Sequence, residues 1–219
     1  MTKLTPVKCY FDPISPFAWL ASKEIGRIEA TGCTVEFVPV LFAAMLNAHG
    51  QKGPAEIPAK RVHTFRDVMR LAAARGLPFT GPPGHPFNPL PALRFSTAIA
   101  DAAARQRFVV AMYAACWERG ADTSDLEVLA GLADECGLDG KALAQGATTP
   151  EVKQALAAAT EQAIAAGVFG VPTFEYEGEF FWGADRIESL LWRVAGNRID
   201  EAALQAFLDR PALAQRRAA

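Results

Sequence analysis

The sequence has no C-x-x-C motif and no spacing of residues typical of metal ligands. Its four cysteines, Cys9, Cys33, Cys116 and Cys136, lie far apart among apolar neighbours, so neither a dithiol redox centre nor a zinc knuckle is indicated. We expect them to be small buried side chains that stay reduced in a cytosol. The three histidines have no partner at metal-ligand spacing, and H-E-x-x-H is absent. The sequence therefore predicts no metal site.

A strong charge of one sign and long apolar runs are also missing. The formal charge is −2 at pH 7, which gives no general attraction to nucleic acid or anionic lipid. No segment approaches the roughly 18 apolar residues of a membrane helix, and the N-terminus has no apolar core of a signal sequence. We therefore expect a soluble, cytoplasmic protein without nucleic-acid or membrane partners.

The chain does contain enough apolar residues for a large core. Of its 219 residues 51% are hydrophobic, which suits one domain with a large insertion or two small ones. Val7 to Phe11 alternates as a strand does, and Ser15 then has the position of an N-cap before Pro16. The following helix is predicted to end near Gly32, and Thr34 to Val40 to form a second strand. This is a βαβ unit with parallel strands.

Residues 41–167 contain no convincing strand, and five or six helical segments are predicted. One runs from Pro58 to Gly76, and a proline-dense loop covers 80–91. Two helices over 93–120 are expected to join near 105–107, a capping box at Ser124 and Glu127 opens the next helix, and Thr149 caps the last. The apolar side of the helix from Pro58 is assigned to Val62, Phe65, Val68 or Met69, and Ala72.

Strands return near the C-terminus. Pro172 to Tyr176 and Glu179 to Trp182 flank a Glu177-Gly178 turn, which predicts an antiparallel hairpin, and a helix is expected over 184–195. The predicted fold class is therefore α/β. A thioredoxin-like domain (βαβ…ββα, residues 1–40 and 168–210) is interrupted by a large all-helical insertion domain (residues 41–167).

The first predicted helix begins at a polar side chain. Its unpaired N–H groups carry a partial positive charge, which favours a carboxylate, phosphate or thiolate near the Ser15 hydroxyl. Taken alone, Ser-Pro before a helix is far more often a plain N-cap. The residues thus indicate an anion site without identifying the anion.

Three stretches carry a resemblance to a known family. FDPISPFAWLA (11–21), IPAK (57–60) and GVFGVPTFEYEGEFFWGADRIESL (167–190) resemble signature segments of the 2-hydroxychromene-2-carboxylate isomerases. These are relatives of kappa-class glutathione transferases and, more distantly, of DsbA-type oxidoreductases. The resemblance covers nearly the whole chain, and its two ends are specific. Ser15 agrees with the family where redox relatives have cysteine, whereas Gln51 stands where family members often have asparagine.

The resemblance implies that glutathione is the cofactor. Its sulfur would be bound by Ser15, the catalytic residue, and its backbone would pair with Val171 beside a cis-proline, as an added strand does. Pro172 is also explained as a proline at the first residue of a strand. Asp185 is also explained as an acidic residue that complements the dipole of the following helix. The implied glutathione-binding residues are Ser15, Lys60, Val171, Pro172, Ala184 and Asp185.

The resemblance also implies a substrate, a small aromatic carboxylate bound where the insertion meets the sheet. Candidate contacts are Lys60, Asn88, Gln51 and Phe17, although Asn88 is equally explained as the cap of the next helix. The implied reaction interconverts 2-hydroxychromene-2-carboxylate and trans-o-hydroxybenzylidenepyruvate in naphthalene-type catabolism, by a homodimer. Two alternatives stay open: a kappa-like glutathione transferase or peroxidase, and a non-catalytic thioredoxin-fold protein that binds peptides.

Overall fold

The structure, a computed structural model, describes residues 5–214. Residues 1–4, on which the expectation of no signal sequence partly depends, lie outside the described part, as do residues 215–219. Between residues 5 and 214, no helix combines the length and the apolar character that crossing a bilayer requires.

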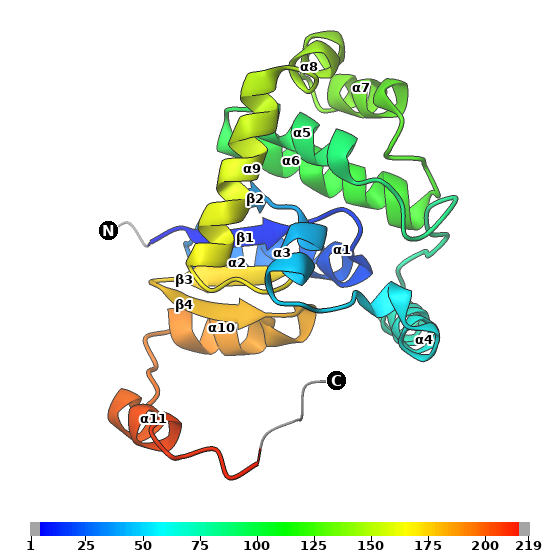
Figure 1. Cartoon of the computed structure of the whole chain (residues 1–219). Helices are drawn as coiled ribbons and strands as arrows, with labels where there is room; N and C mark the ends of the chain where they lie inside the picture. The colour runs from blue at the N-terminus through cyan, green and yellow to red at the C-terminus, as the bar shows by residue number, and fades with distance from the viewer. Residues whose placement is uncertain (1–4, 215–219) are drawn as a thin grey trace.

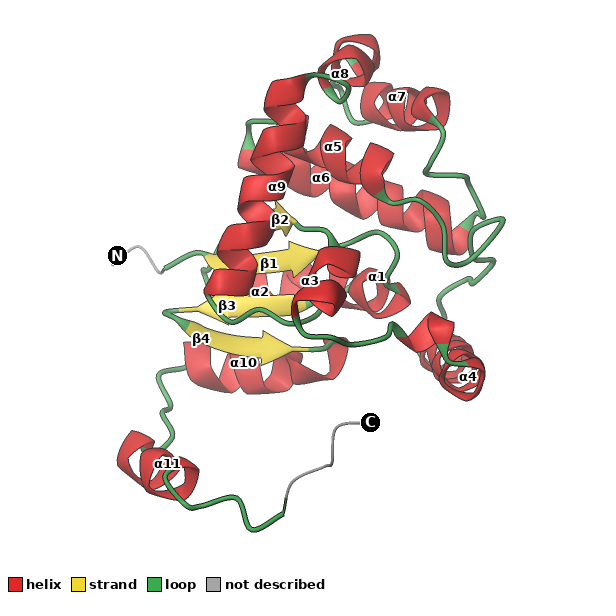
Figure 2. Ribbon diagram, in the orientation of Figure 1, coloured by secondary structure: helices red, strands yellow, loops and turns green. Residues whose placement is uncertain are grey.

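Four strands form one mixed sheet within the described residues, in the order β2-β1-β3-β4 (Figure 2). β1 (Val7–Phe11) runs parallel to β2 (Val35–Pro39). β3 (Thr173–Tyr176) is antiparallel to both β1 and β4 (Glu179–Trp182). The predicted parallel pair and the predicted hairpin are both confirmed, so the two ends of the chain build a single sheet.

Helices cover both faces of this sheet. On one face of β1, Val7, Cys9 and Phe11 are fully buried and belong to the main core. On the other face Tyr10 is buried in a second cluster with residues of α3 (Phe42–Ala48) and α9 (Pro150–Ala165). Figure 1 shows α9 crossing the sheet, with α10 (Ile187–Val194) beside β4.

The first helix is shorter than predicted. α1 (Pro16–Ser22) ends at a turn, and α2 (Ile25–Glu29) follows it, so the expectation of one helix to Gly32 was wrong. The Ser22 hydroxyl donates to the Trp19 carbonyl at 2.7 Å, and the backbone N–H of Lys23 bonds Leu20 instead. A serine that bonds the preceding turn competes with the helical ladder and interrupts it.

The described part of the middle segment contains seven α-helices, α3 to α9, whereas five or six were predicted; α3 and the short helix over 140–146 had no predicted counterpart. α4, the proline-rich loop and the Thr149 cap of α9 are confirmed. The connection between the two helices of residues 93–120 was predicted at 105–107 but lies at 99–101. The reason is that Asp101 caps α6 by accepting from Ala104 N at 2.7 Å. The helices are α4 (Pro58–Ala74), α5 (Leu90–Ala98), α6 (Ala102–Tyr113) with a π-helical turn (Ala114–Glu118), α7 (Leu126–Glu135) and α8 (Gly140–Gly146).

Two details of this segment were wrong. Asp125, and not Ser124, caps α7, because its carboxylate accepts from Glu127 N at 2.8 Å. On α4, Val68 is buried, whereas Val62 and Met69 are 56% and 55% exposed. The apolar stripe is narrower than the sequence suggests because α4 lies at the edge of the molecule (Figure 1).

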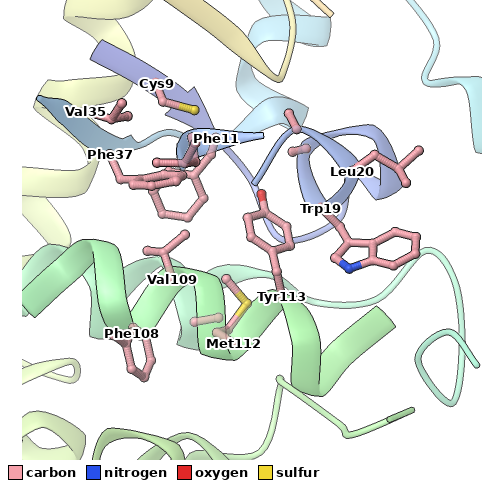
Figure 3. Packing of buried hydrophobic residues seen from close by; sticks show 14 of the residues in the cluster. Cys9, Phe11, Trp19, Leu20, Val35, Phe37, Phe108, Val109, Met112 and Tyr113 are labelled. Atoms are coloured by element: carbon pink, nitrogen blue, oxygen red, sulfur yellow. The ribbon is translucent and has the colours of Figure 1, made fainter. Parts of the chain in front are cut away.

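A single hydrophobic core is shared by the sheet and by the helices that lie between β2 and β3 in the chain. The ring of Phe11 makes edge contacts with Phe37 at 5.5 Å and with Tyr113 of α6 at 6.1 Å between centroids. Val109 and Met112 of α6 lie beneath these rings (Figure 3). The cysteine prediction is confirmed for three of the four, since Cys9, Cys33 and Cys116 are buried, while Cys136 is partly exposed.

The C-terminal part contains two helices. The predicted helix over 184–195 begins as a 3-10 turn (Ala184–Arg186) and continues as α10. α11 (Glu201–Leu208) was not predicted; all its described side chains are exposed, and it stands apart from the sheet (Figure 1). Arg193 ties α10 to the hairpin: Nε lies 2.7 Å from Glu179 and Nη2 lies 2.9 Å from Glu177.

We predict that Arg193→Met lowers the free energy of unfolding by about 1–3 kcal/mol, because buried charge-assisted hydrogen bonds are lost. Arg198→Met is the matched control, since Arg198 contacts the same Glu177 at 3.2 Å but has a side chain that is 51% exposed. Its expected loss is below about 1 kcal/mol. Urea unfolding of both variants measures this, and equal losses would contradict the prediction.

Candidate functional site

Ser15 lies at the junction of the sheet and α1. Its hydroxyl oxygen accepts from Ala18 N at 3.2 Å, so the N-cap prediction is confirmed. The same hydroxyl donates to the carbonyl oxygen of Val171 at 3.4 Å, and Ser15 is 9% exposed. Because α1 has seven residues rather than a helix to Gly32, its dipole is a smaller contribution than the sequence suggested. The hydroxyl itself is the principal polar group at this point.

Val171 and Pro172 form the segment opposite Ser15. Their peptide bond is cis, as predicted. The Pro172 carbonyl accepts from Gly183 N at 2.9 Å, and the Thr173 hydroxyl donates to Gly170 O at 2.7 Å, so the segment is anchored on both sides. Within residues 5–214 the backbone N–H of Val171 has no hydrogen-bond partner. The N–H of Val171, and the second acceptor site of its carbonyl, which already accepts from Ser15, therefore remain for an extended ligand.

Ala184 and Asp185 follow β4 at the start of the 3-10 turn. Ala184 is buried, whereas the Asp185 side chain is 72% exposed and pairs with Arg186 at 3.3 Å. Gly183 has a φ of 113°, and a Cβ there would collide with the Asp185 carboxylate. Glycine at this position lets the carboxylate fold back over the backbone while it stays open to solvent.

Among the described residues, no hydrogen bond joins the remaining predicted residues to Ser15. Lys60, Gln51 and Asn88 are exposed, and Phe17 is half-buried against the core. The Asn88 side-chain oxygen accepts from Leu90 N, in the first residue of α5, at 3.1 Å. The N-cap position itself is Pro89, so Asn88 lies one residue before the cap. Among the described residues, the structure thus joins Ser15 to Val171 by a hydrogen bond, and the candidate substrate contacts stay a prediction.

Asp12 is a residue that sequence reasoning missed. It is fully buried at the end of β1, where its carboxylate accepts from Ile14 N at 3.0 Å and from Phe42 N at 2.9 Å. Burial raises the pKa of Asp12 to about 7, although the two backbone donors oppose this shift. The signal was an acidic residue between Phe11 and Pro13, directly before the cap. Asp12 joins the Ser15 loop to the start of α3.

A groove of about 280 Å³ lies between α3, α5 and α9. Its walls include Leu41, Leu90 and Leu156. Arg94 and Lys153 supply two positive charges and Glu161 one negative charge. The Nε of Arg94 is buried without a partner among the described residues. Leu41 precedes Phe42, whose N–H binds Asp12. One wall residue of the groove, Leu41, is thus the chain neighbour of the residue that binds Asp12.

No group of three His, Cys, Asp or Glu side chains in residues 5–214 is arranged to hold a metal ion. Burial raises the pKa of the Cys116 thiol to about 12 and that of the Cys9 thiol further. Neither thiol is a nucleophile at neutral pH. The sheet order, the cis-proline segment and the helix that begins opposite it define a protein with a thioredoxin-like fold.

Comparisons with known proteins agree with this class. A family model described as the DSBA-like thioredoxin domain matches residues 6–195. A 2-hydroxychromene-2-carboxylate isomerase from Sphingobium xenophagum is 33% identical over 193 residues, 87% of this chain and 97% of that protein. The isomerase of the same name from Pseudomonas putida is 30% identical over 89% of this chain and 98% of its own length. A kappa 1 glutathione S-transferase from Caenorhabditis elegans is 32% identical over 85 residues, 38% of each chain.

Solved structures show the same fold. A 2-hydroxychromene-2-carboxylate isomerase superposes with a TM-score of 0.81 at 23% identity, covering 94% of this chain and all of the other. The cytosolic disulfide reductase DsbM from Pseudomonas aeruginosa, in a structure with GSH, has a TM-score of 0.61 at 18% identity over 93% and 99%. The chain belongs to the DSBA-like thioredoxin family, in the branch that includes the 2-hydroxychromene-2-carboxylate isomerases. It is an enzyme of this isomerase and transferase family.

Proposed function

We propose that this protein is a glutathione-dependent isomerase that interconverts 2-hydroxychromene-2-carboxylate and trans-o-hydroxybenzylidenepyruvate in naphthalene-type catabolism. The observation that carries the proposal is the Ser15 hydroxyl 3.4 Å from the carbonyl of Val171, beside a Val171 N–H with no partner among the described residues. A hydroxyl next to a strand-like edge suits a thiol-bearing peptide. The names of two relatives, 2-hydroxychromene-2-carboxylate isomerase, support the substrate and the isomerisation. The product, the cofactor and the pathway are part of the proposal.

The residues present fit glutathione. Val171 N–H and C=O would pair with the cysteinyl unit, and the exposed Asp185 carboxylate would bind the γ-glutamyl ammonium. When bound, glutathione would supply a thiolate that adds to the conjugated substrate and is released again, so that it is not consumed. The Ser15 hydroxyl would turn its hydrogen from Val171 toward the sulfur and hold the negative charge there.

The second substrate would lie where the helices meet the Ser15 loop. The groove between α3, α5 and α9 combines apolar walls with Arg94 and Lys153, against one carboxylate, Glu161. Apolar walls with an excess of positive charge suit an aromatic carboxylate. Lys60, exposed on the first turn of α4, is a further candidate for a carboxylate of glutathione or substrate. These residues would orient the substrate, and Ser15 would act on the sulfur.

The test is a pair of measurements on the purified protein. Titration calorimetry should show glutathione binding, and absorbance should follow isomerisation of the chromene in its presence. Conjugation of a chlorinated aromatic without isomerisation would favour a kappa-like transferase, because a kappa transferase is among the relatives. No affinity for glutathione would overturn the proposal and favour a protein that binds peptides.

We predict that Asp185→Asn weakens glutathione binding about 10- to 100-fold, the effect of losing one charge-assisted hydrogen bond. Glu188→Gln, one turn further along and with a 74% exposed side chain paired to Arg27, is the matched control and should bind as the wild type does. Calorimetry measures both affinities. Unchanged binding in Asp185→Asn would remove this residue from the cofactor site.

A further inference from the structure

The loop that leads to Ser15 has three consecutive carbonyl oxygens bonded to aromatic side chains. Tyr113 Oη donates to Asp12 O at 3.0 Å, and Trp117 Nε1 donates to Pro13 O at 3.1 Å. His85 Nε2 lies 3.0 Å from Ile14 O, and because a carbonyl can only accept, Nε2 carries the proton. We call Tyr113, Trp117 and His85 the ring clamp.

All three members of the ring clamp come from the helical segment between β2 and β3. Tyr113 ends α6, Trp117 lies in the π-helical turn, and His85 lies in the proline-rich loop. Tyr113 and Trp117 are fully buried, and the hydroxyl of Tyr113 points to the loop after β1 (Figure 3). Buried bonds of this kind cannot be replaced by water without cost. The loop is therefore held from the insertion side.

His85 is held as a neutral donor. Its ring makes edge contact with Phe65 at 5.0 Å and lies 5.8 Å from Trp117. Burial lowers the pKa of His85, the bond to Ile14 raises it in part, and the charge of Arg61, which donates to the His85 carbonyl at 3.1 Å, lowers it. Nδ1 is buried without a partner among the described residues. A second proton would therefore have no acceptor.

These bonds bear directly on Ser15. The N–H of Ser15 bonds Asp12 O at 3.1 Å, the same oxygen that accepts from Tyr113. The hydrogen bond from each ring keeps the carbonyl oxygens of residues 12–14 directed toward the helical insertion. If a carbonyl were released, it could rotate toward a thiolate at Ser15 and disfavour the charged sulfur.

We propose that His85, Trp117 and Tyr113 are positioning residues for the sulfur site. They fix the Ser15 hydroxyl and hold the carbonyl oxygens of residues 12–14 away from the thiolate. This inference rests on the proposed function, because it concerns the sulfur that Ser15 binds. It gives the helical insertion a role in cofactor ionisation as well as in substrate binding.

The test compares His85→Leu with His85→Gln. Glutamine can place an N–H near the position of Nε2, whereas leucine cannot donate. We expect His85→Leu to raise the pKa of the thiol of bound glutathione by about one unit, which lowers the thiolate-to-thiol ratio tenfold. The ultraviolet absorbance of the thiolate measures this ratio. His85→Gln should restore most of the ratio. Tyr113→Phe, which removes one hydroxyl, should act in the same direction if His85→Leu fails to fold.

The matched control is Phe79→Leu. Phe79 belongs to the same aromatic cluster, 5.9 Å from Trp19 and 6.2 Å from Trp117, but it donates to no carbonyl. We expect it to lower stability and to leave the thiol pKa unchanged. An equal rise in the thiol pKa in Phe79→Leu and His85→Leu, or no rise in His85→Leu, would overturn the positioning role.

Amide hydrogen exchange keeps this inference separate from the proposed function. In His85→Leu, but not in His85→Gln or Phe79→Leu, protection of the Ser15 and Ala18 N–H groups should fall about tenfold without any ligand. If the wild type bound no glutathione, the proposed function would fail while this measurement still reported on the clamp. Unchanged exchange in His85→Leu would count against the clamp whatever the protein binds.

Discussion

Ser15→Ala should lower turnover about 10²- to 10³-fold, the cost of removing one donor that holds a developing charge. The hydroxyl is the polar group that faces Val171, and no other side chain donates to that carbonyl among the described residues. Stability should fall by about 1 kcal/mol, because the same oxygen caps α1. Isomerisation at saturating glutathione and urea unfolding measure the two effects separately.

Thr149→Ala is the matched control for the loss of a cap. Thr149 caps α9 through its hydroxyl, which accepts from Val152 N at 3.4 Å, and it takes no part in the proposed site. We expect a similar loss of stability with full turnover. Near-normal turnover in Ser15→Ala would remove Ser15 from the chemistry.

Asp12 should make the stability of the protein fall as the pH rises from about 4 to 7. The pKa of its carboxyl is raised from 3.8 to about 7 in the folded state, so in this range the folded protein holds a proton that the unfolded chain has released. The contribution of Asp12 to the free energy of unfolding is complete below about pH 4 and is lost as the pH rises through about 7. A shift of this size corresponds to about 4 kcal/mol.

Asp12→Asn isolates this effect, because other titrating groups cancel in the comparison with the wild type. At pH 5 the variant should be less stable by about 1–3 kcal/mol, since an amide has one oxygen and leaves the N–H of Ile14 or Phe42 unpaired. At pH 8 the deficit should vanish or reverse. Urea unfolding at both pH values tests this, and a deficit independent of pH would show that Asp12 does not titrate in this range.

The elements that local patterns determine could be predicted from the sequence. The strand at Val7, the cap at Ser15 and the hairpin at Gly178 each depend on residues within a few positions. The break at Ser22 could not be predicted, because the hydroxyl could equally have pointed to solvent. Asp101 and Asp125 show the same difficulty, since several polar residues near each helix start could serve as caps.

The residues of the candidate site that lie within a recognisable sequence motif could be predicted. Ser15 and the cis-proline segment lie within the family's end segments, and the structure places them in contact. Asp12 and the ring clamp were missed because their roles depend on distant partners. His85 meets Ile14 across 71 positions and Tyr113 meets Asp12 across 101. No residue spacing in the sequence predicts a hydrogen bond between such distant positions.

The shared core determines how the chain can be recombined with its relatives. Because Phe11 and Phe37 pack on Val109, Met112 and Tyr113, neither the strands nor the intervening helices have a closed interior of their own. A chimera that exchanged residues 41–167 with another member would have to match the shape of α6 to the rings of β1 and β2. A graft of the segment alone would meet strand side chains of another shape, so such a chimera needs compensating changes on both surfaces.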